Sequence, residues 1–216
     1  MLRRLAFVLL VAAPSAQAEP LPAAPEAGGP RAFRVAIERG ALNMRESPST
    51  GGAVVAKLEP GALLSNLGCE LAEGRGWCDV QSIFGGPRGY AAAEHLAPAI
   101  GPDGAAPMGE DDSAYRAGLG DYDATGSIPC ALGEGQPTGT CEMGVARGTG
   151  GYATLVVKLP EGRERLFFFV LGHAVGASTV EADPTGPFSA RREGDLTIIR
   201  LGSERYEAPD AAVLGG

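Results

Sequence analysis

Cysteine and histidine are the residues in this chain with the most obvious chemistry: it has four cysteines and two histidines. A cysteine nucleophile needs a free thiolate beside an imidazole that a third group orients. His95 and His173 are the two imidazoles, and neither has a free cysteine signalled beside it in the sequence. His95 follows Glu94 in a closing turn, and His173 ends a strand, so we expect both to be turn or surface residues.

The spacing of the cysteines favours disulfides over catalysis. Cys69 and Cys78 flank a short segment with two glycines that is typical of a hairpin connection. Cys130 and Cys141 flank a loop rich in Gly, Pro and Thr. Neighbours on paired strands come within disulfide reach. We therefore predict the bridges Cys69–Cys78 and Cys130–Cys141.

Other catalytic and metal-binding motifs are not found in the sequence. The thiols do not form the Cys-x-x-Cys pairs of zinc sites, and Ser-x-x-Lys, His-Glu-x-x-His and Gly-x-Ser-x-Gly do not occur. We expect a protein that is not an enzyme, with no catalytic residue, no metal ligand and no cofactor.

Aromatic side chains are the remaining candidates for recognition, because they line many peptide and glycan grooves. Trp77 is the only tryptophan, and Tyr90 follows it in the same half of the chain. We predict Trp77 and Tyr90 as the ligand-binding residues. A core role for Trp77 is the alternative, since it begins a strand beside a predicted disulfide. Arg205 and Tyr206 are further candidates near the C-terminus.

The first residues have the pattern of a secretory signal peptide. Arg3 and Arg4 form a basic region, Leu5 to Ala13 is apolar, and Ala16-Gln17-Ala18 is a cleavage pattern. Nine apolar residues are too few to span a bilayer. We expect cleavage near Ala18 and a mature protein that is periplasmic or secreted, where disulfides persist.

The formal net charge of −8 limits the classes of partner. Nucleic-acid phosphates require Lys and Arg, and anionic lipid attracts basic segments. An acidic chain therefore argues against nucleic acid and against docking on a membrane surface, and no stretch after the signal is long enough to span a membrane.

Composition divides the chain into segments. Residues 19–32 form a Pro/Ala-rich spacer, and residues 33–98 contain short alternating strands separated by Gly and Pro turns, which is typical of a small barrel. Residues 99–126 have the Gly, Pro and Asp content of a flexible linker. Residues 127–216 show further strands and no helical period.

The second half is predicted to be an antiparallel sandwich, barrel or meander. Gly148 to Gly151 and Pro160 to Gly162 are hairpin signals. The apolar run Phe167 to Val170 lacks alternation, as in a strand covered on both faces. The strand candidates are 141–147, 152–159, 165–171, 175–181, 195–201 and 204–206.

The first half resembles the bacterial SH3-like domain, a small β-barrel. The resemblance rests on Asn43-x-Arg45-x-x-Pro48, Gly61, Gly76-Trp77 and Gly89-Tyr90, while the segment from Ile83 to Arg88 lengthens the last turn relative to the family. It implies an all-β, SH3-like barrel that binds or positions a partner, such as a cell-wall peptide or an envelope protein. The second half, with Ile128-Pro129-Cys130 near its start, resembles a module of uncharacterised proteobacterial envelope proteins.

The sequence thus predicts an exported binding or scaffolding protein of the cell envelope, with peptidoglycan peptides or an envelope protein as partner. The alternative is a periplasmic inhibitor of a cell-wall hydrolase, similar to lysozyme inhibitors. In that case Ala131 to Thr140 or Gly172 to Val175 would be the inhibitory loop.

Overall fold

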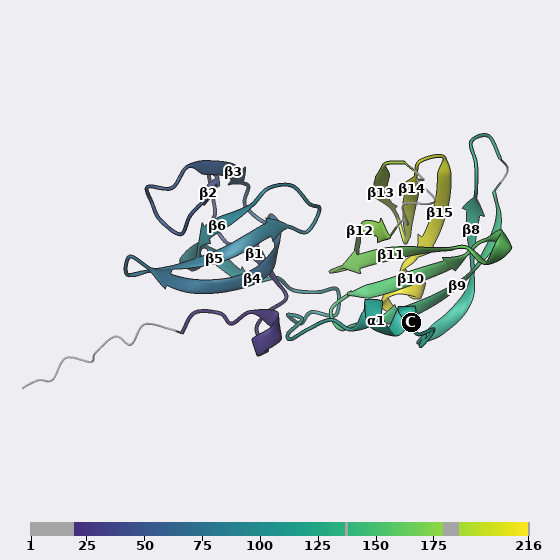
Figure 1. Cartoon of the computed structure of the whole chain (residues 1–216), viewed down its shortest axis with the longest axis horizontal. Helices are drawn as coiled ribbons and strands as arrows, with labels where there is room; N and C mark the ends of the chain where they lie inside the picture. Colours follow the sequence, from purple (N-terminus) through teal and green to yellow (C-terminus); the bar gives the residue numbers. More distant parts are fainter. Residues whose placement is uncertain (1–19, 137, 179–185, 216) are drawn as a thin grey trace, which may run out of the picture.

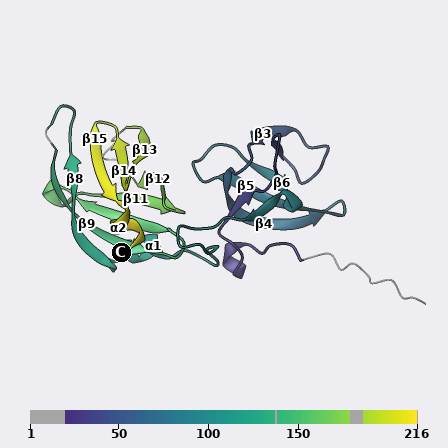
Figure 2. The same cartoon turned by 180° about the vertical axis from the view of Figure 1, so that it is seen from behind.

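The computed structural model describes residues 20–136, 138–178 and 186–215. The predicted signal peptide and its cleavage point near Ala18 lie outside the described residues. The chain forms two antiparallel β-sheets that follow one another along the long axis of the molecule (Figure 1, Figure 2). The predicted all-β class, with two β domains, is confirmed.

The first sheet has seven strands in the order β3-β2-β6-β5-β4-β1-β7. Two 3₁₀ turns accompany it, η1 before β1 and η2 before β7. The elements are η1 (Pro25–Ala27), β1 (Ala32–Val35), β2 (Leu42–Arg45), β3 (Val54–Leu58), β4 (Leu63–Ala72), β5 (Arg75–Ser82), β6 (Arg88–Ala92), η2 (Ala93–His95) and β7 (Leu96–Pro98).

The core of the first domain follows from the strand period of two. Phe33 and Val35 of β1 point to the same side and are fully buried, whereas Arg34 between them is exposed. Met44 of β2 and Val80 of β5 join them in one apolar cluster. Each such side chain contributes about 1.5–3 kcal/mol through burial.

The second sheet has eight strands in the order β12-β11-β10-β9-β8-β15-β14-β13. The strands from β8 to β12 form one meander, those from β13 to β15 form another, and β15 pairs with β8. The elements are α1 (Ser113–Gly118), β8 (Ala124–Ala131), β9 (Gly139–Arg147), β10 (Ala153–Lys158), η3 (Pro160–Gly162), β11 (Glu164–Val170), β12 (His173–Ser178), β13 (Phe188–Glu193), β14 (Leu196–Leu201), β15 (Glu204–Pro209) and α2 (Asp210–Leu214).

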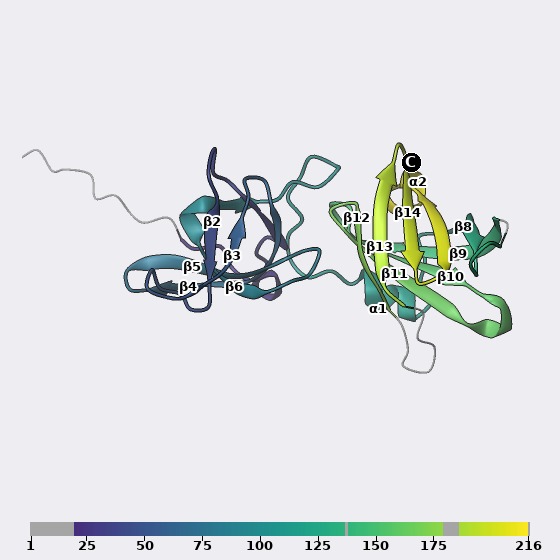
Figure 3. The ribbon, with the colours of Figure 1, turned by 90° about the horizontal axis from the view of Figure 1, so that it is seen from above.

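This sheet curls until its two end strands, β12 and β13, contact each other (Figure 3). Of the three architectures expected, a strongly curled meander is the one observed. Phe167 and Phe169 point into the core, while Leu166 on the other face packs beneath α1 with Ala117 and Val156. The strand is therefore partly covered on both faces, as its apolar run predicts.

Both predicted disulfides are present in the structure. Cys69 and Cys78 are opposite one another on β4 and β5, with Cα atoms 3.9 Å apart. Cys130 and Cys141 join β8 to β9, with Cα atoms 5.8 Å apart. No helix among the described residues is both long and apolar enough to cross a membrane.

The two segments predicted as spacer and linker make defined contacts. Asn66 of β4 donates hydrogen bonds of 2.8 Å to the carbonyl oxygens of two spacer residues, Ala23 and Pro30. Pro30 also forms an isolated bridge with Met108 of the linker. The linker continues into α1, which packs on β9 and β10, and β8 begins at Ala124. Composition alone therefore overestimated the freedom of both segments.

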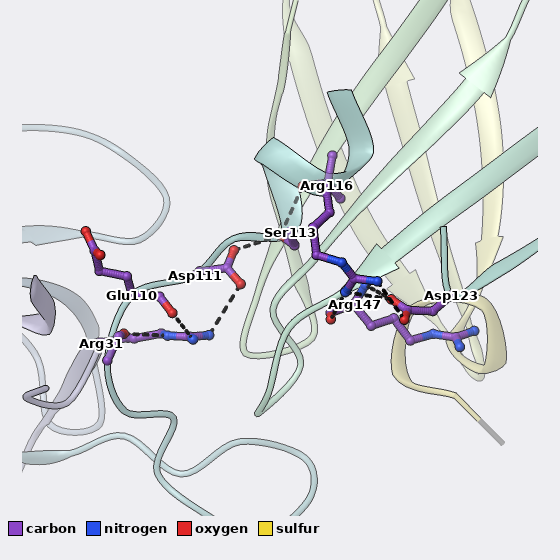
Figure 4. Close-up of polar contacts among 9 residues, drawn as sticks. Arg31, Glu110, Asp111, Ser113, Arg116, Asp123 and Arg147 are labelled. Carbon is purple, nitrogen blue, oxygen red and sulfur yellow. Dashed lines mark hydrogen bonds and ion pairs between the residues drawn. The ribbon is translucent and has the colours of Figure 1, made fainter. Parts of the chain in front are cut away.

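Arg31 connects the first domain with the linker (Figure 4). Its Nε donates to the carbonyl oxygen of Gly109 at 2.7 Å, and its Nη1 lies 3.4 Å from Asp111 Oδ1. Ser113 Oγ donates to Asp111 Oδ2 at 2.7 Å and lies 3.1 Å from Thr154 Oγ1 on β10. A continuous polar path thus runs from β1 to the second sheet.

A small apolar cluster lies beside this path and contains residues of both domains. Ala32 and Ala99 contribute from the first domain, and Tyr152 and Leu171 from the second. The guanidinium of Arg31 lies 4.9 Å from the centre of the Tyr152 ring. Burial raises the pKa of the Tyr152 hydroxyl to about 12, with a smaller opposing effect of Arg31.

Charged contacts hold α1 against the second sheet in the same region (Figure 4). Arg116 Nη2 donates to Asp123 Oδ1 at 2.9 Å, and the backbone N–H of Arg147 donates to Asp123 Oδ2 at 2.6 Å. Both bonds lower the pKa of the Asp123 carboxyl, and the bond from Arg116 has the larger effect.

Candidate functional site

Trp77 lies on the outer face of β5. Cys78 and Val80 belong to the core cluster, so the period of two directs Trp77 and Asp79 to the opposite face. The Trp77 side chain is nevertheless only 2% exposed. Arg75, two residues earlier on the same face, covers it with its guanidinium 5.1 Å from the ring centre. This contact is a cation–π interaction.

A hollow of about 200 Å³ adjoins this ring. We call it the Trp77 pocket. Strand β2, the loop that follows it, β5 and η2 supply its walls. The lining residues are Ala41, Leu42, Asn43, Arg45, Thr50, Arg75, Trp77, Ala92 and His95.

The polar lining of the Trp77 pocket is basic or neutral. Arg45 and Arg75 are its cations, His95 contributes an imidazole, and none of the lining residues is acidic. Arg45 Nη1 donates to the carbonyl oxygen of Gly52 at 2.7 Å, which holds the β2–β3 loop beside the pocket. The positive charge of the pocket lining is thus opposite in sign to the net charge of the chain, which is −8.

Arg75 is held in place by a neighbour outside the pocket lining. Its Nη2 lies 2.5 Å from Glu94 Oε1. The hydrogen bond from Arg75 lowers the pKa of the Glu94 carboxyl, so the pair is ionised near neutral pH. Because both side chains are partly exposed, the pair orients Arg75 more than it stabilises the fold.

Tyr90 lies on the same outer face but does not line the Trp77 pocket. It sits on β6 opposite Asp79 and Arg45, while Trp77 faces Ala92. The two aromatic residues are therefore diagonal neighbours. The structure brings the predicted pair onto one surface, with Trp77 at the pocket and half-buried Tyr90 beside it.

Sequence reasoning did not include Arg75, Arg45 or Asn43 in the site. The signal was available, since Arg75 precedes Trp77 by two residues and so shares its face in a strand. Asn43 and Arg45 likewise alternate with the buried residues Leu42 and Met44. His95 was assigned to the surface, yet it lines the pocket.

The other candidate residues lie in the second domain. Tyr206, a further candidate from the sequence, is fully buried, and its hydroxyl donates to Glu204 Oε2 at 2.8 Å. Arg205 remains at the surface in an ion pair with Glu207. His173 begins β12 at the domain junction, where its ring centre is 5.6 Å from that of Phe84.

The two loops proposed for inhibition have different surroundings. The candidate loop Ala131 to Thr140 comprises the end of β8, the start of β9 and the turn between them, which projects beyond the second sheet and is closed at its base by Cys130–Cys141 (Figure 1). The segment Gly172 to Val175 lies instead against Phe84 of the first domain. The first loop is the more accessible of the two.

Residues 40–97 match the family model described as the bacterial SH3 domain. The match begins before β2 and includes every residue of the Trp77 pocket. No curated protein and no solved structure matches the chain. The resemblance noted for the first half is thus confirmed over residues 40–97, and that for the second half is not.

Proposed function

We propose that this chain is an exported, non-catalytic binding protein of the cell envelope, and that the Trp77 pocket holds its ligand. The observation that carries the proposal is the position of Arg75 and Arg45 around a tryptophan, in an otherwise acidic chain. Guanidinium groups form strong, often bidentate, hydrogen bonds with carboxylates, and the buried indole beneath Arg75 positions one of them through a cation–π contact. The ligand is a short peptide segment that carries a carboxylate.

Two features support a cell-wall location for this ligand. The match to the bacterial SH3 domain suggests a binding module for the cell wall, and the pocket lies inside the matched residues. Two disulfides are compatible with an oxidising compartment outside the cytoplasm. The carboxylate-bearing stem peptides of peptidoglycan fit this chemistry, and a peptide segment of an envelope protein is the second source.

Trp77 provides a direct test, because it is the only tryptophan in the chain. Soluble peptidoglycan fragments, added to the mature protein, are expected to change Trp77 fluorescence in a saturable way. Arg75→Gln should weaken the affinity by about tenfold, since it removes a charge-assisted hydrogen bond. Arg34→Gln, an exposed arginine on β1, is the matched control and should leave the affinity unchanged.

The outcomes separate the two sources of ligand. Binding to isolated peptidoglycan fragments that depends on Arg75 supports the cell-wall peptide. Capture of an envelope protein, competed by a carboxylate-bearing peptide and lost in Arg75→Gln, supports the protein source. If neither interaction depends on Arg75, the Trp77 pocket is not the binding site.

A second candidate function is inhibition of a cell-wall hydrolase by the second domain. The observation in its favour is the projecting β8–β9 turn with a disulfide at its base. Pre-organised loops bind active sites at a lower entropic cost. The full mature chain should then inhibit lysozyme, and alanine substitutions at Gly133 to Gln136 should abolish inhibition. Absence of inhibition at micromolar protein would remove this candidate.

A further inference from the structure

Two arginines face each other on the outer surface of the second sheet. Arg200 on β14 is the direct partner of Arg205 on β15, next to the turn at Gly202 and Ser203. Directly opposed residues in antiparallel strands have Cβ atoms about 4.5–5.5 Å apart, and like charges in such positions destabilise a sheet. This arrangement therefore needs a compensating partner or a functional reason.

The neighbouring strands do not place acidic side chains opposite these two arginines, so the two positive charges are not fully balanced. The residue opposite Arg200 on β13 is Ser189, and the residue opposite Arg205 on β8 is Ala131. Arg205 forms an ion pair with Glu207 on its own strand. For the guanidinium of Arg200, the described part of the chain offers no ion pair and no hydrogen bond. One cationic group is thus left available.

Both arginines line a hollow of about 460 Å³. The turn between β8 and β9 forms its other wall, with Glu134 and Gln136, and Ser203 lies at its edge. In Figure 1 this turn and the β14–β15 turn lie at the same end of the second domain. The volume falls in the range of small-molecule sites, about 300–1,000 Å³.

The side chains of this hollow define the ligand. Two guanidinium groups select a phosphate or carboxylate group, which would also relieve their mutual repulsion. Glu134 disfavours a ligand that is anionic throughout, but it can accept hydrogen bonds from hydroxyl groups. Gln136 and Ser203 can donate to or accept from hydroxyl groups as well. The site therefore combines anion recognition with hydroxyl recognition.

We propose that this hollow, the Arg200–Arg205 site, binds a saccharide that carries a phosphate or a carboxylate group. The site lies in the second domain and does not depend on the Trp77 pocket. Two opposed arginines that bind a ligand lower the stability of the protein when no ligand is bound, and such a trade-off is common at functional sites. Arg200→Gln should accordingly weaken binding without lowering the melting temperature.

The test uses the mature protein and four probes of known chemistry. Glucose 6-phosphate and glucuronate carry the two anionic groups, glucose lacks an anion, and inorganic phosphate lacks the sugar. Amide chemical shifts and calorimetry should show binding of one or both anionic sugars, with shifts at Gln136 and Ser203. Glucose and phosphate should bind at least about tenfold more weakly, because each lacks one set of contacts.

Matched variants decide the role of the arginines. Arg200→Gln and Arg205→Gln should each weaken sugar binding by about tenfold. Arg191→Gln, an exposed arginine on β13 outside the hollow, should leave it unchanged. Equal binding of inorganic phosphate, no binding of either anionic sugar, or insensitivity to Arg200→Gln would each overturn the proposal. A preference for glucose 6-phosphate or for glucuronate shows whether the site recognises a phosphate or a carboxylate group.

Discussion

A buried ion pair lies inside the second domain. Arg165 of β11 is 2% exposed, and its Nε and Nη2 each donate to a carboxylate oxygen of Glu204 on β15 at 2.9 Å. The Tyr206 hydroxyl donates to the same carboxylate. Burial, followed by this bond to Glu204, raises the pKa of Tyr206, so its hydroxyl remains protonated at physiological pH. A charged pair in an apolar core tolerates little change in either partner.

Loss of the Glu204 carboxylate should strongly destabilise the second domain. We expect Glu204→Gln to lower the free energy of unfolding by about 3–5 kcal/mol, because it removes the charge opposite buried Arg165. Tyr206→Phe should cost only about 0.5–1.5 kcal/mol, the usual contribution of one hydrogen bond. Urea unfolding measures both.

Glu207→Gln is the control for this prediction, since Glu207 pairs with Arg205 on the opposite face of the same strand. It should cost less than the variant at Glu204, about 1 kcal/mol, because this pair keeps partial contact with solvent. If the variants at Glu204 and Glu207 lower the free energy of unfolding by similar amounts, the buried ion pair contributes no more to stability than the pair of Arg205 with Glu207.

The sequence contained part of the evidence for this network. Arg165 shares its strand face with Phe167 and Phe169, which marks it as inward-pointing. Its partner could not be identified, because Glu204 is distant in sequence and the pairing follows from how the two meanders of the second sheet meet. The sequence left the position of Tyr206 open for the same reason.

The loop between β5 and β6 has a structural role that its sequence did not reveal. It carries Phe84, which is 60% exposed yet touches the ring of His173 edge to face. The first domain thus reaches the second through this loop. Burial, and secondarily Arg192 of β13, lowers the pKa of His173.

The contact of Phe84 with His173 should weaken in mild acid. A folded-state pKa below the usual value of about 6.5 means that the buried position of His173 favours the neutral imidazole. The stability that this position contributes is therefore present above that pH and is lost as the pH falls through the folded-state pKa. Protection factors of the β5–β6 loop amides, which correct the exchange rates for the pH dependence of intrinsic exchange, should be lower at pH 5 than at pH 7.5.

His173→Gln should remove this pH dependence, whereas His95→Gln should retain it. His95 lines the Trp77 pocket and is remote from the junction contact. A pH dependence that persists in His173→Gln would assign the effect to another titrating group.

Local elements were the most predictable part of the fold. The two disulfides join cysteines 9 and 11 residues apart, so a hairpin pattern sufficed to find them. Strand β13 was missed because five of its six residues are exposed and it carries no alternating apolar pattern. In the candidate site, aromatic type identified Trp77 and Tyr90, while the cations around Trp77 required knowledge of which side chains share its face.

At the scale of the whole molecule, the two domains are joined by more than a chain connection. The Arg31 contacts, the apolar cluster around Tyr152 and the Phe84–His173 contact all cross the junction. Linker composition predicted flexibility, because Gly, Pro and Asp residues bury little apolar area. Contacts with both domains hold the linker in a defined position, although the linker's own sequence does not favour one conformation.

Arg31 should be the most important single side chain at this junction. Its hydrogen bonds reach the linker, and its guanidinium contacts Tyr152 of the second domain. Arg31→Gln removes the charge-assisted bonds, each worth about 1.5–3 kcal/mol. We expect faster proteolytic cleavage within residues 100–112 and a larger radius of gyration by small-angle X-ray scattering, with each domain still folded.

Arg34→Gln is the matched control, because Arg34 follows Arg31 by three residues, on β1, but is exposed and makes no ion pair with any other described residue. It should leave cleavage and dimensions unchanged. Equal behaviour of the two variants would mean that the apolar cluster around Tyr152 fixes the junction without Arg31. A difference confined to Arg31→Gln would instead show that one guanidinium sets the relative position of the Trp77 pocket and the Arg200–Arg205 site.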